Sequence, residues 1–291
     1  MIVIASFLFA TMGVCVKLAS SEYSSGEIVF YRSVTGALFM ALFARWQGGT
    51  LRTPVPAMHF WRSLSGVTGL CLWFYALGGL PLATAMTLNY MSSVWMALFL
   101  IGGAIALGSS RVDGRLVFTV LLGFAGVAFV LRPTIAEQQL WHGLMGLLSG
   151  MFGAMAYLQV TALGRVGEPE YRVVFYFSLG GMLAGLLQVP FTGVHAHSPR
   201  GLLLLVATGL LATVAQLLMT RAYGIGRVLV NASLQYLGIV FSFGFGVLLF
   251  GDRLAPLAIF GIALIVGAGL LATLLRSRTL PADAAGTPAE S

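Results

Sequence analysis

Residues 63–110 read SLSGVTGLCLWFYALGGLPLATAMTLNYMSSVWMALFLIGGAIALGSS, without a single Lys, Arg, Asp or Glu. An α-helix needs about 20 apolar residues to cross roughly 30 Å of hydrocarbon, so this stretch is long enough for two crossings. Within a bilayer the backbone must satisfy its own hydrogen bonds, which leaves helices or closed barrels. Barrel strands would alternate in polarity over about 10 residues, whereas this stretch is continuously apolar. It therefore predicts membrane-spanning helices.

Similar uncharged stretches cover residues 173–199, 228–251 and 254–275. The whole chain is 58% hydrophobic and 9% charged, with a mean hydropathy of +0.94. An average soluble domain carries about 25% charged residues. A water-soluble fold of this length could not bury so much apolar surface, so we expect most of it to face lipid.

The apolar segments and the turn residues between them predict an all-α integral membrane protein with ten transmembrane helices. The predicted helices span residues 2–20, 28–46, 58–79, 83–107, 115–132, 141–163, 171–190, 201–222, 228–250 and 256–275. The Pro-, Ala- and Gly-containing segment 277–291 is expected to be a disordered tail.

The net charge of +7 is spread between the apolar segments, which argues against a nucleic-acid-binding patch. Arginine excess marks the cytoplasmic side of bacterial membrane proteins. With the amino terminus inside, the cytoplasmic loops and flanks hold Arg45, Arg52, Arg62, Arg111, Arg115, Arg165, Arg172, Arg221, Arg227, Arg276 and Arg278, and the external side holds Lys17, Arg132, Arg200 and Arg253. We therefore predict a multi-pass protein of the bacterial inner membrane with both termini cytoplasmic.

The two halves of the chain resemble each other weakly. A shift of 146 residues places Asn89-Tyr90 on Gln235-Tyr236, and a shift of 143 places Glu27 on Glu170. Because five helices is an odd number, the second half must insert upside down relative to the first. Inverted repeats are common in transporters, with the substrate site between the halves. We predict repeats at residues 1–133 and 140–276.

Several short motifs carry a family resemblance over residues 1–275. They are Phe30-Tyr31-Arg32, Phe74-Tyr75-Ala76-Leu77, Leu80-Pro81-Leu82-Ala83, Gly126-Val127, Leu131-Arg132-Pro133 and Phe250-Gly251-Asp252-Arg253-Leu254. In order and spacing they resemble the EamA-type branch of the drug/metabolite transporter superfamily. The resemblance implies ten helices, two EamA repeats and a central cavity that opens alternately to either side.

The resemblance also bears on substrate and helix shape. Asn89-Tyr90 is similar to a pair in bacterial aromatic amino-acid exporters. Family members often have a proline midway along the fourth and ninth helices, where this chain has Ser93 and Ile239. Other relatives carry riboflavin or S-adenosylmethionine.

Polar side chains within membrane helices tend to face a partner or a cavity. Asn89 and Ser93 are four residues apart, as are Asn231 and Gln235, so each pair shares a helix face. Adding aromatic and amide groups, the predicted substrate-binding residues are Asn89, Tyr90, Ser93, Trp95, Tyr157, Gln159, Gln216, Asn231, Gln235 and Tyr236. The alternatives are interhelical hydrogen bonds for the amides and hydroxyls, and packing or an interfacial belt for the aromatic rings.

We interpret the charged residues near the external side as structural. Lys17, Glu27 and Arg32 are expected to form salt bridges or to extend to the interface, with gating as the alternative. No acidic residue lies midway along a predicted helix, which argues against a carboxylate proton relay or a usual sodium site.

The chain shows no sequence pattern typical of an enzyme. It has no H-E-x-x-H motif, no paired carboxylates and no Walker-type loop. We expect no catalytic residues, no metal site and no cofactor. The expected partners are a small-molecule substrate and the lipid bilayer, without nucleic acid, and the sequence is compatible with a monomer.

Together these features predict an alternating-access exporter of small organic metabolites, with amino acids of broad or aromatic-leaning specificity as the first choice of substrate. The alternative is uptake of a vitamin or nucleoside-like compound of the riboflavin or S-adenosylmethionine type.

Overall fold

A computed structural model describes residues 1–92, 94–96, 98–99, 102, 114–136, 139–224, 234–253 and 255–279. Within these residues all regular structure is helical, as predicted. The helices are α1 (Ile2–Ala19), α2 (Ser25–Trp46), α3 (Pro56–Gly79), α4 (Leu82–Tyr90), α6 (Gly114–Ala136), α7 (Leu140–Arg165), α8 (Glu170–Thr192), α9 (Pro199–Gly224), α11 (Leu237–Phe250) and α12 (Pro256–Thr279). Residues 280–291 of the predicted tail lie outside the described residues.

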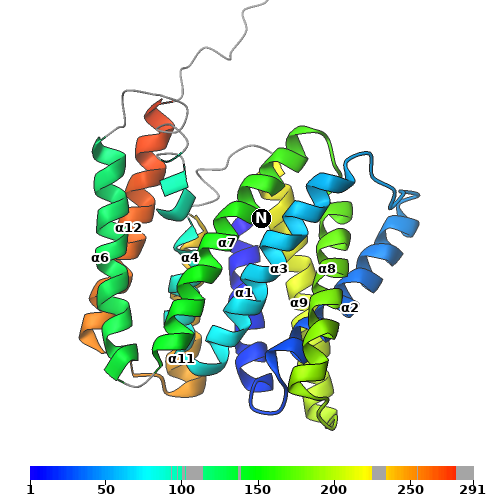
Figure 1. Ribbon diagram of the computed structural model, residues 1–291, viewed down its shortest axis with the longest axis horizontal. Helices are drawn as coiled ribbons and strands as arrows, with labels where there is room; N and C mark the ends of the chain where they lie inside the picture. Colours follow the sequence, from blue (N-terminus) through cyan, green and yellow to red (C-terminus); the bar gives the residue numbers. More distant parts are fainter. Residues whose placement is uncertain are drawn as a thin grey trace, which may run out of the picture.

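The helices of the two halves are interlaced (Figure 1). The α2–α8 pair lies at one edge of the molecule and the α6–α12 pair at the opposite edge. Between them, α1 packs on α9 while α3 packs on α7. In the same way α1 contacts α11 while α4 contacts α7, and α2 contacts α9 while α3 contacts α8. When the halves are exchanged, α1–α9 becomes α3–α7 and α2–α9 becomes α3–α8.

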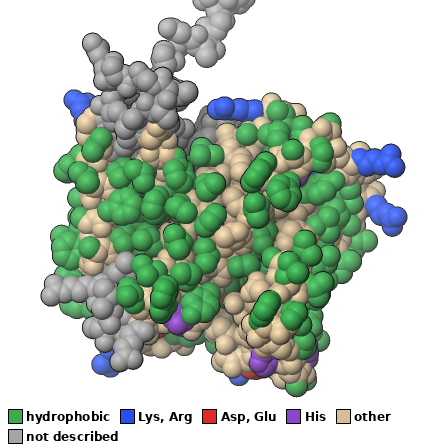
Figure 2. All heavy atoms as spheres, viewed as in Figure 1, with side chains coloured by type: hydrophobic (Ala, Val, Ile, Leu, Met, Phe, Trp, Pro, Cys, Tyr) green, Lys and Arg blue, Asp and Glu red, His purple; other side chains and the backbone are tan. Residues whose placement is uncertain are grey.

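The surface of the helix bundle is apolar between two more polar ends. In Figure 2, hydrophobic side chains cover the middle of the face in view, and lysine and arginine side chains lie at its ends. Leu42, Leu187 and Leu248 are among the large apolar side chains that are more than half exposed. Among the described helices, α1, α2, α7, α8 and α9 are long and apolar enough to cross a membrane. This surface suits lipid as its solvent.

Local signals in the sequence explain where several helices begin and end. At the start of α2, the Glu27 backbone N–H donates to the Ser24 hydroxyl, and the Ser24 N–H donates to the Glu27 carboxylate. This capping box satisfies two backbone groups that the first turn would leave open. At the end of α11, Gly251 adopts a φ of 62°, a left-handed conformation that glycine accepts without steric cost.

The helices predicted over 83–107 and 228–250 are both interrupted in the middle. α4 ends at Tyr90, Met91 forms a turn, and helical structure resumes at Ser92. In the second half, Tyr236 forms the equivalent turn before α11. Neither turn contains a proline, so no residue type in the sequence signals these breaks.

Glycine lets neighbouring helices approach both interruptions. A Cβ at Gly150 of α7 would lie 2.6 Å from the Leu88 carbonyl oxygen and 2.9 Å from that of Asn89. At Gly238 of α11 it would meet the Tyr90 ring. The two interruptions therefore lie close together, where the halves cross.

Candidate functional site

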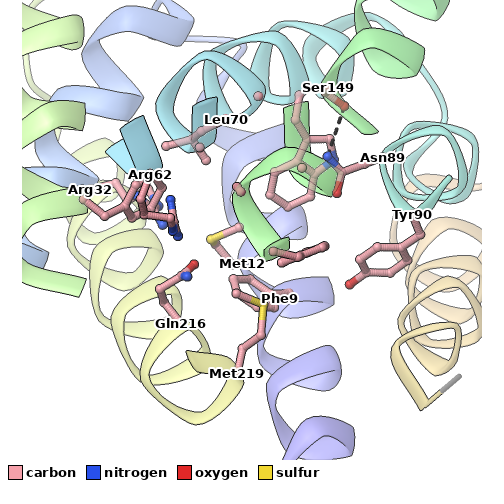
Figure 3. A pocket seen from close by; sticks show the side chains of 17 residues that line it. Phe9, Met12, Arg32, Arg62, Leu70, Asn89, Tyr90, Ser149, Gln216 and Met219 are labelled. Atoms are coloured by element: carbon pink, nitrogen blue, oxygen red, sulfur yellow. Dashed lines mark hydrogen bonds between the residues drawn. The ribbon is translucent and has the colours of Figure 1, made fainter. Parts of the chain in front are cut away.

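A cavity of about 80 Å³ lies among the helices of both halves, beside the interruption of α4 (Figure 3). Its apolar wall is formed by Phe9, Met12, Leu70, Trp73, Phe177 and Met219. Its polar groups come from Arg32, Arg62, Asn89, Tyr90, Ser149, Tyr157 and Gln216. Pockets for drug-sized ligands measure about 300–1,000 Å³, so this cavity must widen to admit most organic solutes.

Four predicted residues, Asn89, Tyr90, Tyr157 and Gln216, line this cavity together. Asn89 lies in the last turn of α4, and its amide N–H donates to the Ser149 hydroxyl at 3.0 Å. Figure 3 shows the Gln216 amide on the opposite side, facing the two arginines. Amides can donate and accept hydrogen bonds, so these groups can orient a polar solute from two sides.

A second layer of polar side chains fixes Tyr157. The Gln235 amide N–H donates to the Tyr157 hydroxyl at 3.1 Å, and the Gln235 carbonyl oxygen accepts from Tyr223 at 3.1 Å. The Tyr157 and Tyr223 rings are stacked, with centroids 5.2 Å apart. Gln235 therefore lies behind the cavity wall and orients one of its aromatic rings, rather than lining the cavity itself.

The remaining predicted residues lie elsewhere or outside the described part of the chain. Gln159 accepts a hydrogen bond from Ser65 at 2.5 Å and so links α7 to α3. Trp95 packs edge-to-face on Phe124 at 5.1 Å, and Tyr236 lines an apolar groove between α11 and α12. Ser93 and Asn231 lie outside the described residues.

Arg32 and Arg62 are cavity residues that the sequence interpretation missed. Arg32 was expected near the external interface and Arg62 in a cytoplasmic flank, but they are only 4% and 3% exposed. Their guanidinium carbons lie 5.1 and 4.3 Å from the centre of the Phe177 ring. Each arginine lies about 10 Å inside its helix start at 1.5 Å per residue, and its long side chain extends further inward. One sequence feature could have identified these two cavity residues. Each arginine lies within a helix and has no acidic residue three or four positions away to pair with.

One end of the α2–α8 pair is held by a group that we call the Glu27 clasp, which comprises Ser24, Glu27, Thr192 and His195. The Glu27 carboxylate accepts from the His195 backbone N–H at 2.8 Å and contacts His195 Nδ1 at 2.6 Å. The Ser24 and Thr192 hydroxyls are 3.2 Å apart. The expected ion pairing of Glu27 therefore involves the α8–α9 loop, while Lys17 lies 3.5 Å from Asp252.

The other end of the pair is held by the Glu168 clasp, which comprises Thr50, Thr53, His59, Glu168 and Arg172. The buried Glu168 carboxylate accepts from the Thr53 hydroxyl at 2.6 Å and from Arg172 at 2.8 Å. His59 Nε2 lies 3.6 Å from the same carboxylate. Arg172 also donates to the Thr50 carbonyl oxygen at 2.9 Å. The α2–α3 loop is thus tied to the start of α8.

Replacing Glu168 with glutamine should loosen the Glu168 clasp. Glutamine keeps the shape but leaves the Arg172 charge without its partner, at a cost of about 1–3 kcal/mol. We expect a lower thermal unfolding midpoint and faster tryptic cleavage after Arg52, which lies exposed in the tied loop. Glu170→Gln, two residues away and outside the clasp, is the matched control. Unchanged cleavage in Glu168→Gln would mean that the carboxylate does not hold the loop.

Comparisons with known proteins connect this geometry to transport. Residues 1–132 match the model of the EamA-like transporter family. The chain is 32% identical to the pseudopaline exporter CntI of Pseudomonas aeruginosa, covering 95% of this chain and 94% of that protein. It is 26% identical to a riboflavin transporter of Rhizobium johnstonii, covering 92% and 88%. A solved crystal structure, 20% identical, superposes with a TM-score of 0.65 over 95% of this chain and 96% of that one.

Proposed function

The chain belongs to the EamA-like transporter family, and on this premise we propose that it exports small organic metabolites across the bacterial inner membrane. It is a multi-pass membrane transporter and not an enzyme. The proposed substrates are amino acids and related compounds, with a broad or aromatic-leaning range. The observation that carries this proposal is the cavity beside the α4 interruption, because its amides, hydroxyl groups and aromatic wall suit amphiphilic solutes.

The proposed architecture is ten membrane-spanning helices in two inverted repeats, residues 1–133 and 140–276. The exchange-symmetric contacts support it, since α1–α9 matches α3–α7 and α2–α9 matches α3–α8. The equivalent interruptions at Met91 and Tyr236 support it as well. Broken helices near the midplane are a recurrent feature of transporter binding sites, because unwound backbone offers polar groups to a substrate.

The proposed mechanism is alternating access around this cavity. The Glu27 clasp and the Glu168 clasp lie at opposite ends of the α2–α8 pair, which makes them the natural gates. Opening one while the other stays closed would expose the cavity to one side of the membrane only. Export is favoured over uptake because the relative with 32% identity is an exporter.

Counterflow in proteoliposomes tests the proposed function. Vesicles preloaded with unlabelled amino acids should accumulate the labelled compound with saturable kinetics, and aromatic amino acids should compete. Competition by riboflavin or S-adenosylmethionine instead would favour the alternative substrate class. If no amino acid shows saturable exchange, amino-acid transport is rejected.

A cysteine-labelling experiment tests the inverted topology. We expect a cysteine at Gln47 to react from the cytoplasmic side and one at Val194 from the external side, because both positions are exposed and lie at opposite ends of α2 and α8. The native Cys15 and Cys71 are first replaced with alanine. Labelling of both sites by the same impermeant reagent on intact cells contradicts the proposed arrangement.

A further inference from the structure

The Arg32–Arg62 pair is a concentration of positive charge that the described protein does not neutralise. We propose that these two arginines bind a substrate bearing at least two carboxylates, so that the transported solute is an organic anion such as a dicarboxylate or an acidic amino-acid derivative. This inference rests on the proposed transport function, and among the proposed amino acids and related compounds it selects those with a second carboxylate over the zwitterionic aromatic amino acids.

The geometry concentrates both charges on one side of the cavity. Both guanidinium groups lie against the same Phe177 ring, at 5.1 and 4.3 Å, one reaching it from α2 and the other from α3. Figure 3 shows them side by side and directed towards the cavity, with the Gln216 amide facing them. Phe177 therefore positions two forks of N–H donors, and such forks match the geometry of carboxylates.

Hydrogen bonding within the described protein leaves these donors available. Arg32 Nε, Arg62 Nε and Arg62 Nη1 are buried and make no hydrogen bond to the described residues. Buried charges are ordinarily paired, because an unpaired one loses its hydration without compensation. A cavity-facing pair of such groups therefore points to a ligand rather than to a structural contact.

Three of the described carboxylates form ion pairs with other residues. Glu27, five residues before Arg32 on α2, pairs with His195. Glu168 pairs with Arg172, and Asp252 with Lys17. None of the described acidic residues forms an ion pair with Arg32 or Arg62, so the pair carries a charge of about +2 at neutral pH.

This charge sets the substrate class. A zwitterionic amino acid brings one carboxylate and one ammonium group, so its net charge leaves both cations uncompensated. A solute with two carboxylates can satisfy one guanidinium with each. The remaining wall, with Trp73, Phe9 and Met219, suits the carbon skeleton of an organic anion better than inorganic phosphate, which has no apolar surface to bury.

Thermal unfolding of the purified full-length protein with defined probes tests the proposal, since a ligand of the folded state raises the unfolding midpoint. The probes are succinate, citrate and L-glutamate, each at constant ionic strength, against succinamide and L-glutamine as neutral counterparts. We expect a saturable rise with the carboxylates only. No rise with any of the three, an equal rise with the neutral amides, or an equal rise with sodium sulfate overturns it.

Variants then assign the effect to the arginine pair. Arg32→Gln and Arg62→Gln should weaken binding of the stabilising carboxylate by about tenfold or more. Arg45→Gln, exposed in the last turn of α2, should bind it as the unchanged protein does. Gly66→Ala keeps both charges but places a Cβ against the Arg62 guanidinium, and it should weaken binding without removing charge. Unchanged carboxylate binding in both Arg→Gln variants overturns the assignment.

The outcomes separate this inference from the proposed function. Saturable amino-acid counterflow without any carboxylate binding would reject the anion site and leave transport standing. Carboxylate binding that depends on both arginines, without counterflow of any solute, would support the site and reject transport.

Discussion

Arg62→Met is expected to make the protein more stable and to abolish its transport. Arg62 is 3% exposed, without an ion pair to the described residues, and close to a second cation. Replacing buried charges by apolar residues often stabilises proteins by about 1–4 kcal/mol. We expect a rise of about 5 °C in the unfolding midpoint without substrate. Transport should fall at least about 100-fold, because the proposed dicarboxylate substrate would lose one of its two buried charged partners.

The two readouts of Arg62→Met distinguish a binding residue from a structural one. Counterflow in proteoliposomes and thermal unfolding in detergent are measured on the same preparation. Arg165→Met, at the exposed end of α7, removes the same charge and should change neither quantity. A lower unfolding midpoint for Arg62→Met would show that the arginine stabilises the fold. That result contradicts the expected combination of higher stability and lost transport.

Gly150→Ala is expected to have the second large effect, through a single added methyl group. The new Cβ would lie 2.6 Å from the Leu88 carbonyl oxygen and 2.9 Å from that of Asn89. Both are backbone atoms, so neither can rotate away as a side chain could. Overpacking of this kind costs about 1–3 kcal/mol. Because α7 would push Asn89 out of place, we expect a lower unfolding midpoint and at least about tenfold slower transport.

Gly153→Ala is the matched control for Gly150→Ala. It lies one turn further along α7, and its added Cβ would meet only the Ser92 Cβ at 3.8 Å, an ordinary contact. Alanine within a helix is intrinsically favoured over glycine by about 1 kcal/mol. Gly153→Ala should therefore be neutral or slightly stabilising. Gly153 also lines the cavity, so the comparison uses the unfolding midpoint: an equal fall in both variants would show that close approach at Gly150 is not what matters.

The helical fold was largely predictable because lipid imposes a strong compositional constraint. Uncharged stretches such as 173–199 and 254–275 coincide with most of α8 and α12. The interruptions at Met91 and Tyr236 were not predictable in the same way. They contain no proline, and they depend on contacts between distant helices, such as Gly150 of α7 against the end of α4.

The polar cavity was predictable in part. Asn89 and Gln216 could be selected because an amide in an apolar helix needs a partner. Gln159 and Gln235 carry the same signal, yet the structure uses them to brace Ser65 and Tyr157, a distinction that requires knowing which helices are neighbours. Arginine is ambiguous for another reason. It marks the cytoplasmic side when it reaches water, and only the packing of Phe177 reveals that Arg62 turns inward.

The two clasps have a consequence for the energetics of the transport cycle. The Glu27 clasp and the Glu168 clasp tie both ends of the α2–α8 pair. In the proposed alternating-access cycle, a carrier without solute must break the contacts of one clasp before its open side can change, and no solute contact offsets that free-energy cost. A bound solute can offset the loss. Return of a loaded carrier should thus outpace return of an empty one, so that swapping solutes across the membrane is faster than net flow in one direction.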